Sequence, residues 1–399
     1  MRAKDLDSLS AEVIPVKMNF EDRLRRARDG MRKSGIGMMF LTYGANLWYL
    51  AGIRRQVPHT TDSNAYGDYL CGAYIGADDG LILLVPRMGS GFYQLEAEKK
   101  PWVDEVRTIN ESETPRNVLA DIVKQFHLDR RGIALDDRAW IQGALEFEHV
   151  LPRSRISLAS EIVAPMRMIK DVDEIAVMKK AGQITDAVYG EVLGFLKEGV
   201  TEYDVSYEID HQFAKRGVEY PSFATGVRFT KPGEGQRTDI RRATDRPLKR
   251  GHSVTFDFGT CYEGYCSDFG RTAFMGEPPA EFRKIHDLVI QAQGSAIKAM
   301  VSGKITAAQL DRVARSMIEK AGYGEGFTHR LGHGIGVTVH EPPFLYPPDE
   351  TKLASNMTFT VEPSIRLPDG YSCRVEDVVM VTEKGGLPLS NFHKELTVI

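Results

Sequence analysis

Apolar residues in the N-terminal part of the chain alternate between helical and strand spacing. Residues 20–34 predict an amphipathic helix whose apolar face holds Phe20, Leu24, Ala27 and Met31. Apolar segments at 38–41, 73–76, 81–85 and 132–135 predict strands, and those at 118–126 and 141–150 predict further helices. Ala164-Pro165-Met166 predicts a break, because proline lacks the backbone N–H that a helix interior needs. We therefore expect an α/β domain over residues 1–164.

Residues 35–53 carry no charged side chain and are long enough to be read as a membrane span. Glycines, Thr42 and Asn46 interrupt the apolar run, and Tyr43-Gly44-Ala45-Asn46 predicts a turn. We interpret this segment as a buried strand and its exit, and we expect no association with a membrane.

The C-terminal part of the chain contains an internal repeat of helices. Thr201 begins one predicted helix that ends at Gly217, and Thr306 begins another that ends at Gly322, 16 positions later in both cases. Threonine is a common helix N-cap, and glycine commonly ends a helix. Longer predicted helices over residues 171–198 and 280–302 precede the two capped helices.

Two β-rich segments follow each capped helix and predict hairpins over residues 254–272 and 358–381. The turn of the second hairpin is expected at Pro368-Asp369-Gly370. The repeated order of helix, helix and hairpin predicts an α+β domain over residues 165–399, with two halves related by a pseudo-twofold axis.

Each predicted hairpin carries two acidic residues on otherwise apolar strands. These are Asp257 and Asp268 in the first hairpin and Glu362 and Glu376 in the second. Carboxylates are rarely buried unless they are paired or bound to a metal ion, because desolvating an unpaired charge is costly. A single acid on a strand is usually an edge charge, but four in symmetric positions are hard to explain as solvated surface. They therefore need a counter-charge.

Three histidines, His329, His333 and His340, lie within twelve residues between the second capped helix and its hairpin. Neutral imidazole together with carboxylate oxygens suits manganese, iron, cobalt or zinc. The glycines around His333 allow the backbone to approach another group closely. The pattern favours a dinuclear metal site with bridging carboxylates.

The composition is that of a folded enzyme, with 42% hydrophobic and 27% charged residues and a formal charge of -4. No overall basic field points to a nucleic acid partner. Four scattered cysteines with no C-x-x-C pair favour a reduced, cytoplasmic compartment, and the first 26 residues show no signal peptide.

The segment HRLGHGIGVTVHE at residues 329–341, with the four acids and Arg374-Val375-Glu376 at these spacings, resembles the pita-bread metallohydrolases. This family includes aminopeptidase P, prolidase, methionine aminopeptidase and the metal-free creatinase. The segment NLWYLAG at residues 46–52 resembles the creatinase/prolidase N-terminal domain, which methionine aminopeptidase lacks. The resemblance spans residues 15–390 and favours the prolidase branch.

The resemblance implies a set of two divalent metal ions, manganese first, with cobalt, zinc or iron as alternatives. The implied ligands are Asp257, Asp268, His333, Glu362 and Glu376. Asp268 and Glu376 would bridge the ions, and a bridging water would be the nucleophile whose proton Glu362 accepts. By the same resemblance His340 and His329 would contact the substrate and the tetrahedral oxyanion, and Arg374 would orient a ligand carboxylate.

The implied activity is that of an Xaa-Pro aminopeptidase or dipeptidase, acting on a peptide or a small amide as a cytoplasmic homodimer. Two positions depart from the family pattern: Ile240 replaces a histidine that usually contacts the substrate, and Gly270 stands where threonine is common. These departures leave two alternatives open. One is a creatinase-like, ectoine-hydrolase-like or lyase relative that acts on a small non-peptide, and the other is a non-catalytic binding protein with the same fold.

Four arginines are candidates for binding the substrate. Arg241 and Arg242 lie in a basic segment before the first hairpin, and we expect one of them to select a carboxylate-bearing substrate. Arg54 and Arg55 begin a polar loop that runs to Tyr69, and we expect this loop to close the site of a neighbouring subunit.

Overall fold

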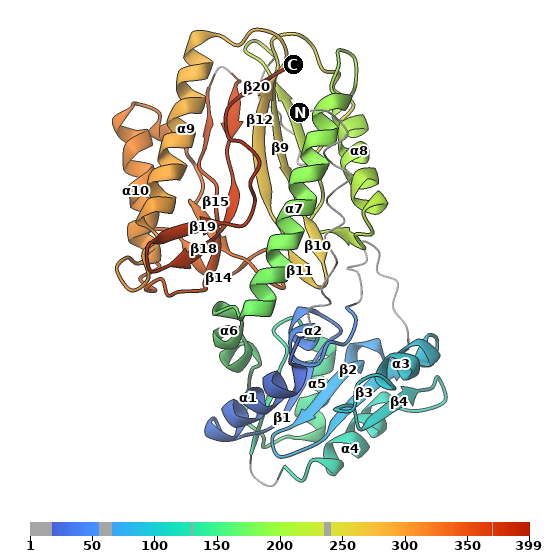
Figure 1. The fold of residues 1–399 in the computed structure, drawn as a ribbon. Helices are drawn as coiled ribbons and strands as arrows, with labels where there is room; N and C mark the ends of the chain where they lie inside the picture. The colour runs from blue at the N-terminus through green and yellow to red at the C-terminus, as the bar shows by residue number, and fades with distance from the viewer. Residues whose placement is uncertain (1–17, 56–65, 129–130, 235–240, 369) are drawn as a thin grey trace.

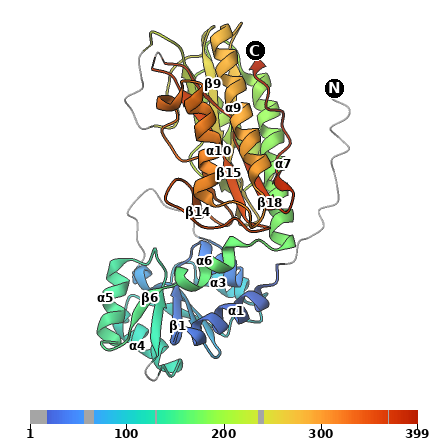
Figure 2. The same cartoon turned by 90° about the vertical axis from the view of Figure 1, so that its left-hand side faces the viewer.

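The computed structural model describes residues 18–55, 66–128, 131–234, 241–368 and 370–399. Figures 1 and 2 show an N-terminal domain below and a larger C-terminal domain above, with the long helix α7 (Val172–Phe195) rising from the junction. Among these residues no helix combines the length and the apolar character that a membrane crossing requires.

The N-terminal domain is built on a six-stranded mixed sheet of order β4-β3-β2-β1-β5-β6. Its strands are β1 (Ile36–Leu41), β2 (Gly72–Gly76), β3 (Leu81–Pro86), β4 (Glu105–Ile109), β5 (Gly132–Leu135) and β6 (Ile156–Leu158). Its helices are α1 (Phe20–Lys33), α2 (Ala45–Ala51), η3 (Asp68–Leu70), α3 (Ser90–Ala97), α4 (Pro115–Gln125), α5 (Ile141–Val150) and α6 (Ser160–Met168). Strand β1 pairs antiparallel with β2 and parallel with β5, and all six of its residues are buried.

One local expectation for this domain is wrong, and another holds only in part. Pro165 lies inside α6 and does not break it, because the N–H that proline lacks would face Glu161, whose surroundings are open to water. The turn expected at 43–46 is replaced in part by helix α2, which begins at Ala45. The strand before it and the helix over residues 20–34 are confirmed as β1 and α1.

The repeated helices of the C-terminal domain are confirmed. They are α8 (Glu202–Lys215) and α10 (Ala307–Lys320), preceded by α7 and α9 (Ala280–Ala299). Thr201 and Thr306 each accept a hydrogen bond from the third residue of the helix that they cap, and both helices have a full capping box. Gly217 and Gly322 follow the helices at φ values of +73° and +89°, which glycine adopts without strain.

Two sheets form the layer beneath these helices, with orders β20-β12-β9-β8 and β14-β13-β15-β18-β19. The first contains β8 (Gly226–Thr230), β9 (Ser253–Phe258), β12 (Phe269–Phe274) and β20 (Thr397–Val398). The second contains β13 (Gly332–Gly334), β14 (Glu341–Leu345), β15 (Thr358–Val361), β18 (Asp377–Thr382) and β19 (Gly385–Pro388), with η4 (Gly324–Gly326) before it. In Figure 1, α9 and α10 flank the second sheet, and α7 and α8 flank the first.

Each predicted hairpin is confirmed as an antiparallel pair, β9 with β12 and β15 with β18. Each pair also encloses a smaller hairpin that the sequence pattern did not separate. These are β10 (Thr260–Tyr262) with β11 (Tyr265–Cys266), joined by β7 (Tyr220–Pro221), and β16 (Ser364–Arg366) with β17 (Ser372–Arg374). Asp369 of the expected second turn lies outside the described residues.

A buried polar cluster joins the two domains. Arg23 of α1 is 2% exposed, and its guanidinium lies 3.1 Å from Asp171 and 3.5 Å from Glu174 at the start of α7. The Tyr265 hydroxyl of β11 donates to the same Glu174 carboxylate over 2.9 Å. Helix α7 is thereby fixed to both domains.

Candidate metal centre

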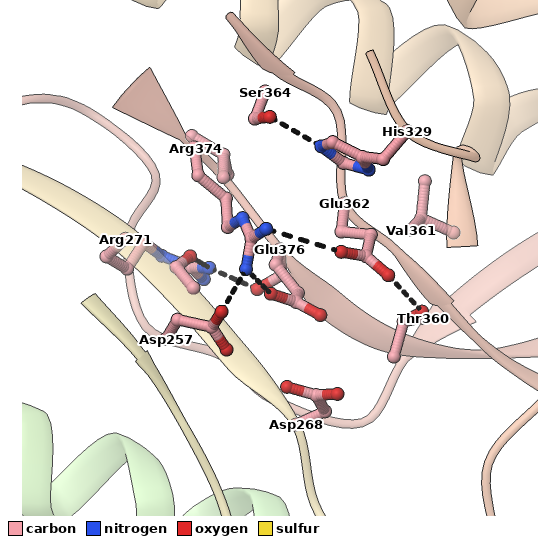
Figure 3. A network of polar contacts seen from close by, with 12 residues as sticks. Asp257, Asp268, Arg271, His329, Thr360, Val361, Glu362, Ser364, Arg374 and Glu376 are labelled. Atoms are coloured by element: carbon pink, nitrogen blue, oxygen red, sulfur yellow. Dashed lines mark hydrogen bonds and ion pairs between the residues drawn. The ribbon is translucent and has the colours of Figure 1, made fainter. Parts of the chain in front are cut away.

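Four acidic residues meet where the two sheets of the C-terminal domain join (Figure 3). Asp257 lies in β9, Asp268 directly precedes β12, Glu362 directly follows β15, and Glu376 directly precedes β18. An antiparallel bridge between Gly270 and Glu376 connects the two sheets at this point. Asp268 and Glu376 therefore occupy equivalent positions in the two hairpins, one residue before the second long strand, as the repeat predicts.

Three of the side chains form a compact group of metal donors. One ligand atom each of Asp268, His333 and Glu376 lies within 4.8 Å of the others, and all three residues are buried. His333 Nε2 lies 3.6 Å from Asp268 Oδ2 and 3.4 Å from Glu362 Oε1. His333 Nδ1 is 3.1 Å from the Gly334 carbonyl oxygen, which can only accept, so Nδ1 carries the proton and Nε2 has a free lone pair.

Thr360 of β15 holds two members of this group together. The His333 backbone N–H donates to Thr360 Oγ1 over 3.0 Å, and this hydroxyl donates to Glu362 Oε1 over 3.1 Å. Because Thr360 is fully buried, it fixes the distance between the histidine strand and the Glu362 carboxylate.

The carboxylates repel one another in a region with little water. Burial, reinforced by the neighbouring carboxylates, raises the pKa of Asp268 and of Glu376 well above the usual range. Burial also raises the pKa of Glu362 to about 7, and it lowers the pKa of His333 to about 3. The cluster thus carries more negative potential than its own cations neutralise.

These residues fit divalent metal ions. Asp268 Oδ1 is buried and has no hydrogen-bond partner among the described residues, although such oxygens are nearly always paired. Carboxylate oxygens with one neutral imidazole and no thiolate suit first-row divalent ions. A bound cation would satisfy both the unpaired oxygen and the excess negative charge.

Two arginines hold Asp257. Arg374 Nη1 lies 2.6 Å from Asp257 Oδ2, and Arg242 Nη2 lies 3.0 Å from Asp257 Oδ1. Burial raises the pKa of Asp257, but the two guanidiniums outweigh it and bring this pKa below its usual value. Arg374 also lies 3.5 Å from Glu376 and 3.7 Å from Glu362, so it sits between three of the acids (Figure 3).

The glycine at position 270 makes room for this arginine. A Cβ atom there would lie 2.7 Å from Arg374 Cδ and 2.8 Å from Glu376 Oε2, closer than side-chain atoms normally approach. A threonine, which the family pattern favours, would therefore collide with the arginine in its present position. The observed position of the Arg374 side chain therefore requires a residue without a Cβ atom at position 270.

The other two histidines lie beside the donors but differ in their partners. The His340 ring packs against the His333 ring with centroids 4.0 Å apart and is exposed on its other side. His329 Nδ1 lies 2.7 Å from the Arg330 carbonyl oxygen, and its Nε2 lies 2.5 Å from Ser364 Oγ. Both ring nitrogens of His329 are therefore engaged within the chain.

The candidate substrate arginines lie in different places. Arg242 reaches Asp257, whereas Arg241 is exposed and does not line the cavity beside Asp257. The Arg54 guanidinium lies 3.6 Å from Glu219, and Arg55 donates to the Gly264 carbonyl in the β10–β11 hairpin. Ile240 and residues 56–65 lie outside the described residues.

Four residues of this region were not singled out from the sequence: Thr360, Ser364, Arg228 and Arg366. Three of them lie within four positions of Glu362, on the continuation of its strand. Side chains alternate between the two faces of a strand, so residues two and four positions from a ligand share its face. This periodicity is the signal that could have found Thr360, Ser364 and Arg366.

Two family models match the chain. Residues 176–383 match the model of metallopeptidase family M24, and residues 23–169 match the creatinase/prolidase N-terminal domain. The two matches confirm the expected architecture of an α/β N-terminal domain and an α+β catalytic domain, and they confirm the resemblance seen in the sequence.

Individual proteins match over nearly the whole chain. The putative dipeptidase YkvY of Bacillus subtilis is 31% identical over 381 residues, which cover 95% of this chain and 100% of the relative. A recombinant prolidase from Thermococcus sibiricus has a TM-score of 0.86 at 30% identity, covering 96% of this chain and 100% of that one. A Xaa-Pro dipeptidase from Bacillus anthracis has a TM-score of 0.81 at 27% identity, with coverage of 96% and 100%.

Proposed function

Because the chain belongs to metallopeptidase family M24, we propose that it cleaves Xaa-Pro peptides with two divalent metal ions. The proposed metal ligands are Asp257, Asp268, His333, Glu362 and Glu376. The observation that carries the proposal is Oδ1 of Asp268, which is buried within a cluster of carboxylates and has no hydrogen-bond partner in the part of the chain that the structure describes. The proline preference rests on the relatives named prolidase and Xaa-Pro dipeptidase.

Divalent ions would lower the pKa of an attacking water and polarise the scissile carbonyl. We propose manganese as the resident metal, since the donor set is dominated by carboxylate oxygen. Cobalt, zinc and iron fit the same donors, so the metal content of the purified protein has to be measured to identify the resident ion.

Glu362 is the proposed proton acceptor. In the metal-free protein burial raises the pKa of Glu362 to about 7, and its place beside the other acids puts this carboxylate where it can take the proton of an attacking water and later return it. Thr360 orients this carboxylate by donating to Oε1, which leaves Oε2 toward Arg374 and the other acids. Arg374 keeps Asp257 and Glu376 in place through its two ion pairs.

The two flanking histidines take different proposed roles. His340 has an exposed ring face next to His333 and is the imidazole available to the substrate carbonyl. His329, whose pKa burial lowers to about 4, is neutral and engaged at both ring nitrogens. We therefore assign it the positioning of Ser364, which lies two residues after Glu362.

The alternatives left open by the sequence are not favoured by the comparisons. The named relatives are dipeptidases and prolidases, which supports a peptidase over a creatinase-like enzyme, a lyase or a non-catalytic binding protein. Three further features stay proposals: a domain division into residues 1–164 and 165–399, a cytoplasmic homodimer, and a contribution of Arg54 and Arg55 to the site of a neighbouring subunit.

The decisive experiment measures metal content together with hydrolysis of Gly-Pro and Ala-Pro by the manganese-, cobalt- and zinc-loaded protein. We expect two ions per chain and turnover of a proline peptide. Asp268→Asn should lose both metal binding and turnover. Asp287 is an exposed acid on α9, and Asp287→Asn should retain both properties. Two ions per chain with no turnover of any proline peptide would refute the proposed substrate, and absence of metal would refute the proposed site.

A further inference from the structure

Two of the four free cysteines lie directly opposite each other in the small hairpin of β10 and β11. Cys261 of β10 pairs with Cys266 of β11. The two turn residues, Glu263 and Gly264, have φ values of +44° and +77°, as in the tight two-residue turns that fix the register of a hairpin. Residues that face each other across an antiparallel pair share one face, so the two thiols are held side by side.

The geometry of this pair suits a disulfide. The Cys266 N–H donates outside the hairpin, to the Gly336 carbonyl over 2.8 Å, so the cysteines form one of the non-hydrogen-bonded pairs. In such pairs the Cα atoms lie about 4.5 Å apart, and a disulfide spans Cα distances of about 4.4–6.8 Å. The two thiols can therefore join without a change in the pairing of the strands.

Only one of the two thiols borders open space. Cys261 lines a cavity of about 270 Å³ at the domain junction, which Trp48 and Arg55 of the N-terminal domain also line. Figure 1 shows β10 and β11 at the lower end of the C-terminal domain, close to α2. Cys266 is 4% exposed and does not line this cavity. A small reagent would thus reach Cys261 first.

The surroundings of Cys261 also favour its reactive form, the thiolate. A hydrogen bond from the Cys266 thiol and the positive charge of Arg55 lower the pKa of Cys261 in spite of its burial. Burial instead raises the pKa of Cys71 and of Cys373 to about 12. The four thiols therefore differ, and Cys261 has the character of an attacking group.

We propose that Cys261 and Cys266 are a site of reversible disulfide formation by exchange with a small disulfide. The Cys261 thiolate attacks one sulfur of the small disulfide, which gives a mixed disulfide and releases the first small thiolate. The Cys266 sulfur then attacks the Cys261 sulfur and releases the second small thiolate, which takes up the Cys266 proton. Two protein thiols are oxidised, and one small disulfide is reduced to two thiols.

The hairpin lies between the domain junction and the candidate metal centre. Arg55 donates to the Gly264 carbonyl at its turn, and the Cys266 N–H holds Gly336 in the histidine-rich segment. Asp268 follows Cys266 by two residues. A disulfide would thus restrain a segment that contacts both domains and leads to a proposed metal ligand. The inference does not depend on the proposed peptidase function.

Mass spectrometry of the purified protein tests the site directly. The protein is equilibrated at rising ratios of mercaptoethanol disulfide to mercaptoethanol, quenched with acid, alkylated with iodoacetamide in denaturant and digested with trypsin. The tryptic peptide 251–271 contains Cys261 and Cys266 and no other cysteine. As the buffer becomes oxidising, this peptide should lose both alkyl groups and appear with two hydrogen atoms fewer. Dithiothreitol should restore both alkylation sites.

The peptides that contain Cys71 and Cys373 are internal controls. Both thiols should remain alkylated at every ratio, because burial keeps them protonated. A peptide 251–271 that keeps two alkyl groups throughout would overturn the proposal. The same holds if that peptide carries two mercaptoethanol adducts in place of an internal disulfide.

Two serine variants test the order of the steps. Cys266→Ser removes the second thiol, so a mixed disulfide with one mercaptoethanol should accumulate on Cys261. Cys261→Ser should leave Cys266 without an adduct in the folded protein and modified only in urea. Cys71→Ser is the matched control and should keep the reversible disulfide. Equal adduct formation in the two folded variants would overturn the assignment of Cys261 as the attacking thiol.

Discussion

Close contacts at single residues set the geometry of the candidate metal centre. Gly270 leaves space for Arg374, and Arg374 in turn separates Asp257, Glu362 and Glu376. Among the described residues Asp268 forms no ion pair with an arginine or lysine, and its Oδ1 has no hydrogen-bond partner. The site therefore combines Asp257, whose charge two arginines neutralise, with carboxylates such as Asp268 whose charge a bound ion would neutralise.

Gly270→Ala should destabilise the metal-free protein by about 1–3 kcal/mol, because its methyl group would collide with Arg374 and Glu376. In an Arg374→Ala background the same change should be less costly, since one of the colliding side chains is then shortened. Urea unfolding of the four proteins measures this coupling. Gly294→Ala on α9, where a new methyl group meets no atom within 4 Å, is the control and should not destabilise. If Gly270→Ala lowered the free energy of unfolding equally in both backgrounds, Arg374 would not be the side chain that requires glycine at position 270.

His286 of α9 is a second residue with an unusual environment. It is 1% exposed, neither ring nitrogen has a hydrogen-bond partner among the described residues, and burial lowers its pKa to about 4. In the unfolded chain the His286 ring takes up a proton near the ordinary histidine pKa of about 6.5, whereas in the folded protein it stays neutral. The free energy of unfolding therefore decreases as the pH falls from about 6.5 to about 4.

His286→Leu should remove that acid sensitivity, because leucine neither titrates nor leaves an unpaired polar group. The expected gain is about 4–5 kcal/mol near pH 4, the sum of about 3 kcal/mol from the lost titration and about 1–2 kcal/mol from the unpaired nitrogens, and it decreases to about 1–2 kcal/mol at neutral pH, where only the unpaired nitrogens are relieved. Urea unfolding at pH 4.5, 5.5 and 7.5 measures it. A stability difference that does not grow toward low pH would show that His286 finds a partner in solution.

At the scale of secondary structure, the two halves of the catalytic domain repeat one another. Each half has a long helix, a threonine-capped helix, and a strand pair that encloses a smaller hairpin. The repeat brings Asp268 and Glu376 to the same position, one residue before a strand. The candidate metal centre thus lies where the two halves meet.

The capping threonines should contribute equally if the halves are structurally equivalent. Thr201→Ala and Thr306→Ala should each cost about 1 kcal/mol of unfolding free energy, since each removes a side-chain acceptor for a backbone N–H. Thr201→Ser and Thr306→Ser retain that acceptor and serve as controls. Thermal or chemical unfolding measures the four values, and a large loss in the serine variants would show that packing, not capping, dominates.

At the scale of the whole molecule, the histidine segment is tied to the junction between the domains. Glu341, which follows His340 directly, is 5% exposed and lies 2.6 Å from Lys170 Nζ and 2.5 Å from Arg167 Nη2. These two cations lower the pKa of Glu341 in spite of its burial, which by itself raises it. The C-terminal end of α6 and the residues that follow it therefore anchor the end of the segment that carries His340.

Glu341→Gln should destabilise the protein by about 3 kcal/mol, because it leaves Lys170 and Arg167 without their buried counter-charge. It should also lower activity, since the His340 backbone loses its fixed neighbour. Glu111→Gln, which breaks an exposed ion pair with Arg87, is the control and should leave the free energy of unfolding nearly unchanged. Similar losses in the two variants would mean that the junction contributes no more than the surface does.

Much of the fold and of the candidate site could be predicted from the sequence, because these features depend on local patterns. The threonine caps, the glycine stops and the continuous apolar run of β1 depend only on nearby residues, and the structure has them where the sequence places them. The four acids could be singled out because charges on apolar strands are rare. The break predicted at Pro165 was wrong because the hydrogen bond that proline cannot donate to the Glu161 carbonyl is lost at an exposed position. That exposure is set by tertiary packing.

The sequence by itself determined which residue types the site has and how they repeat, since spacing and periodicity are properties of the chain. Only the tertiary structure decided which of them touch. In the tertiary structure Arg242 forms an ion pair with Asp257, whereas its neighbour Arg241 does not line the cavity beside Asp257. The fold also brings Arg228 and Arg366 to that cavity from strands more than a hundred residues apart in sequence. Contacts between distant segments depend on how the sheets pack, and one short stretch of sequence does not encode that packing.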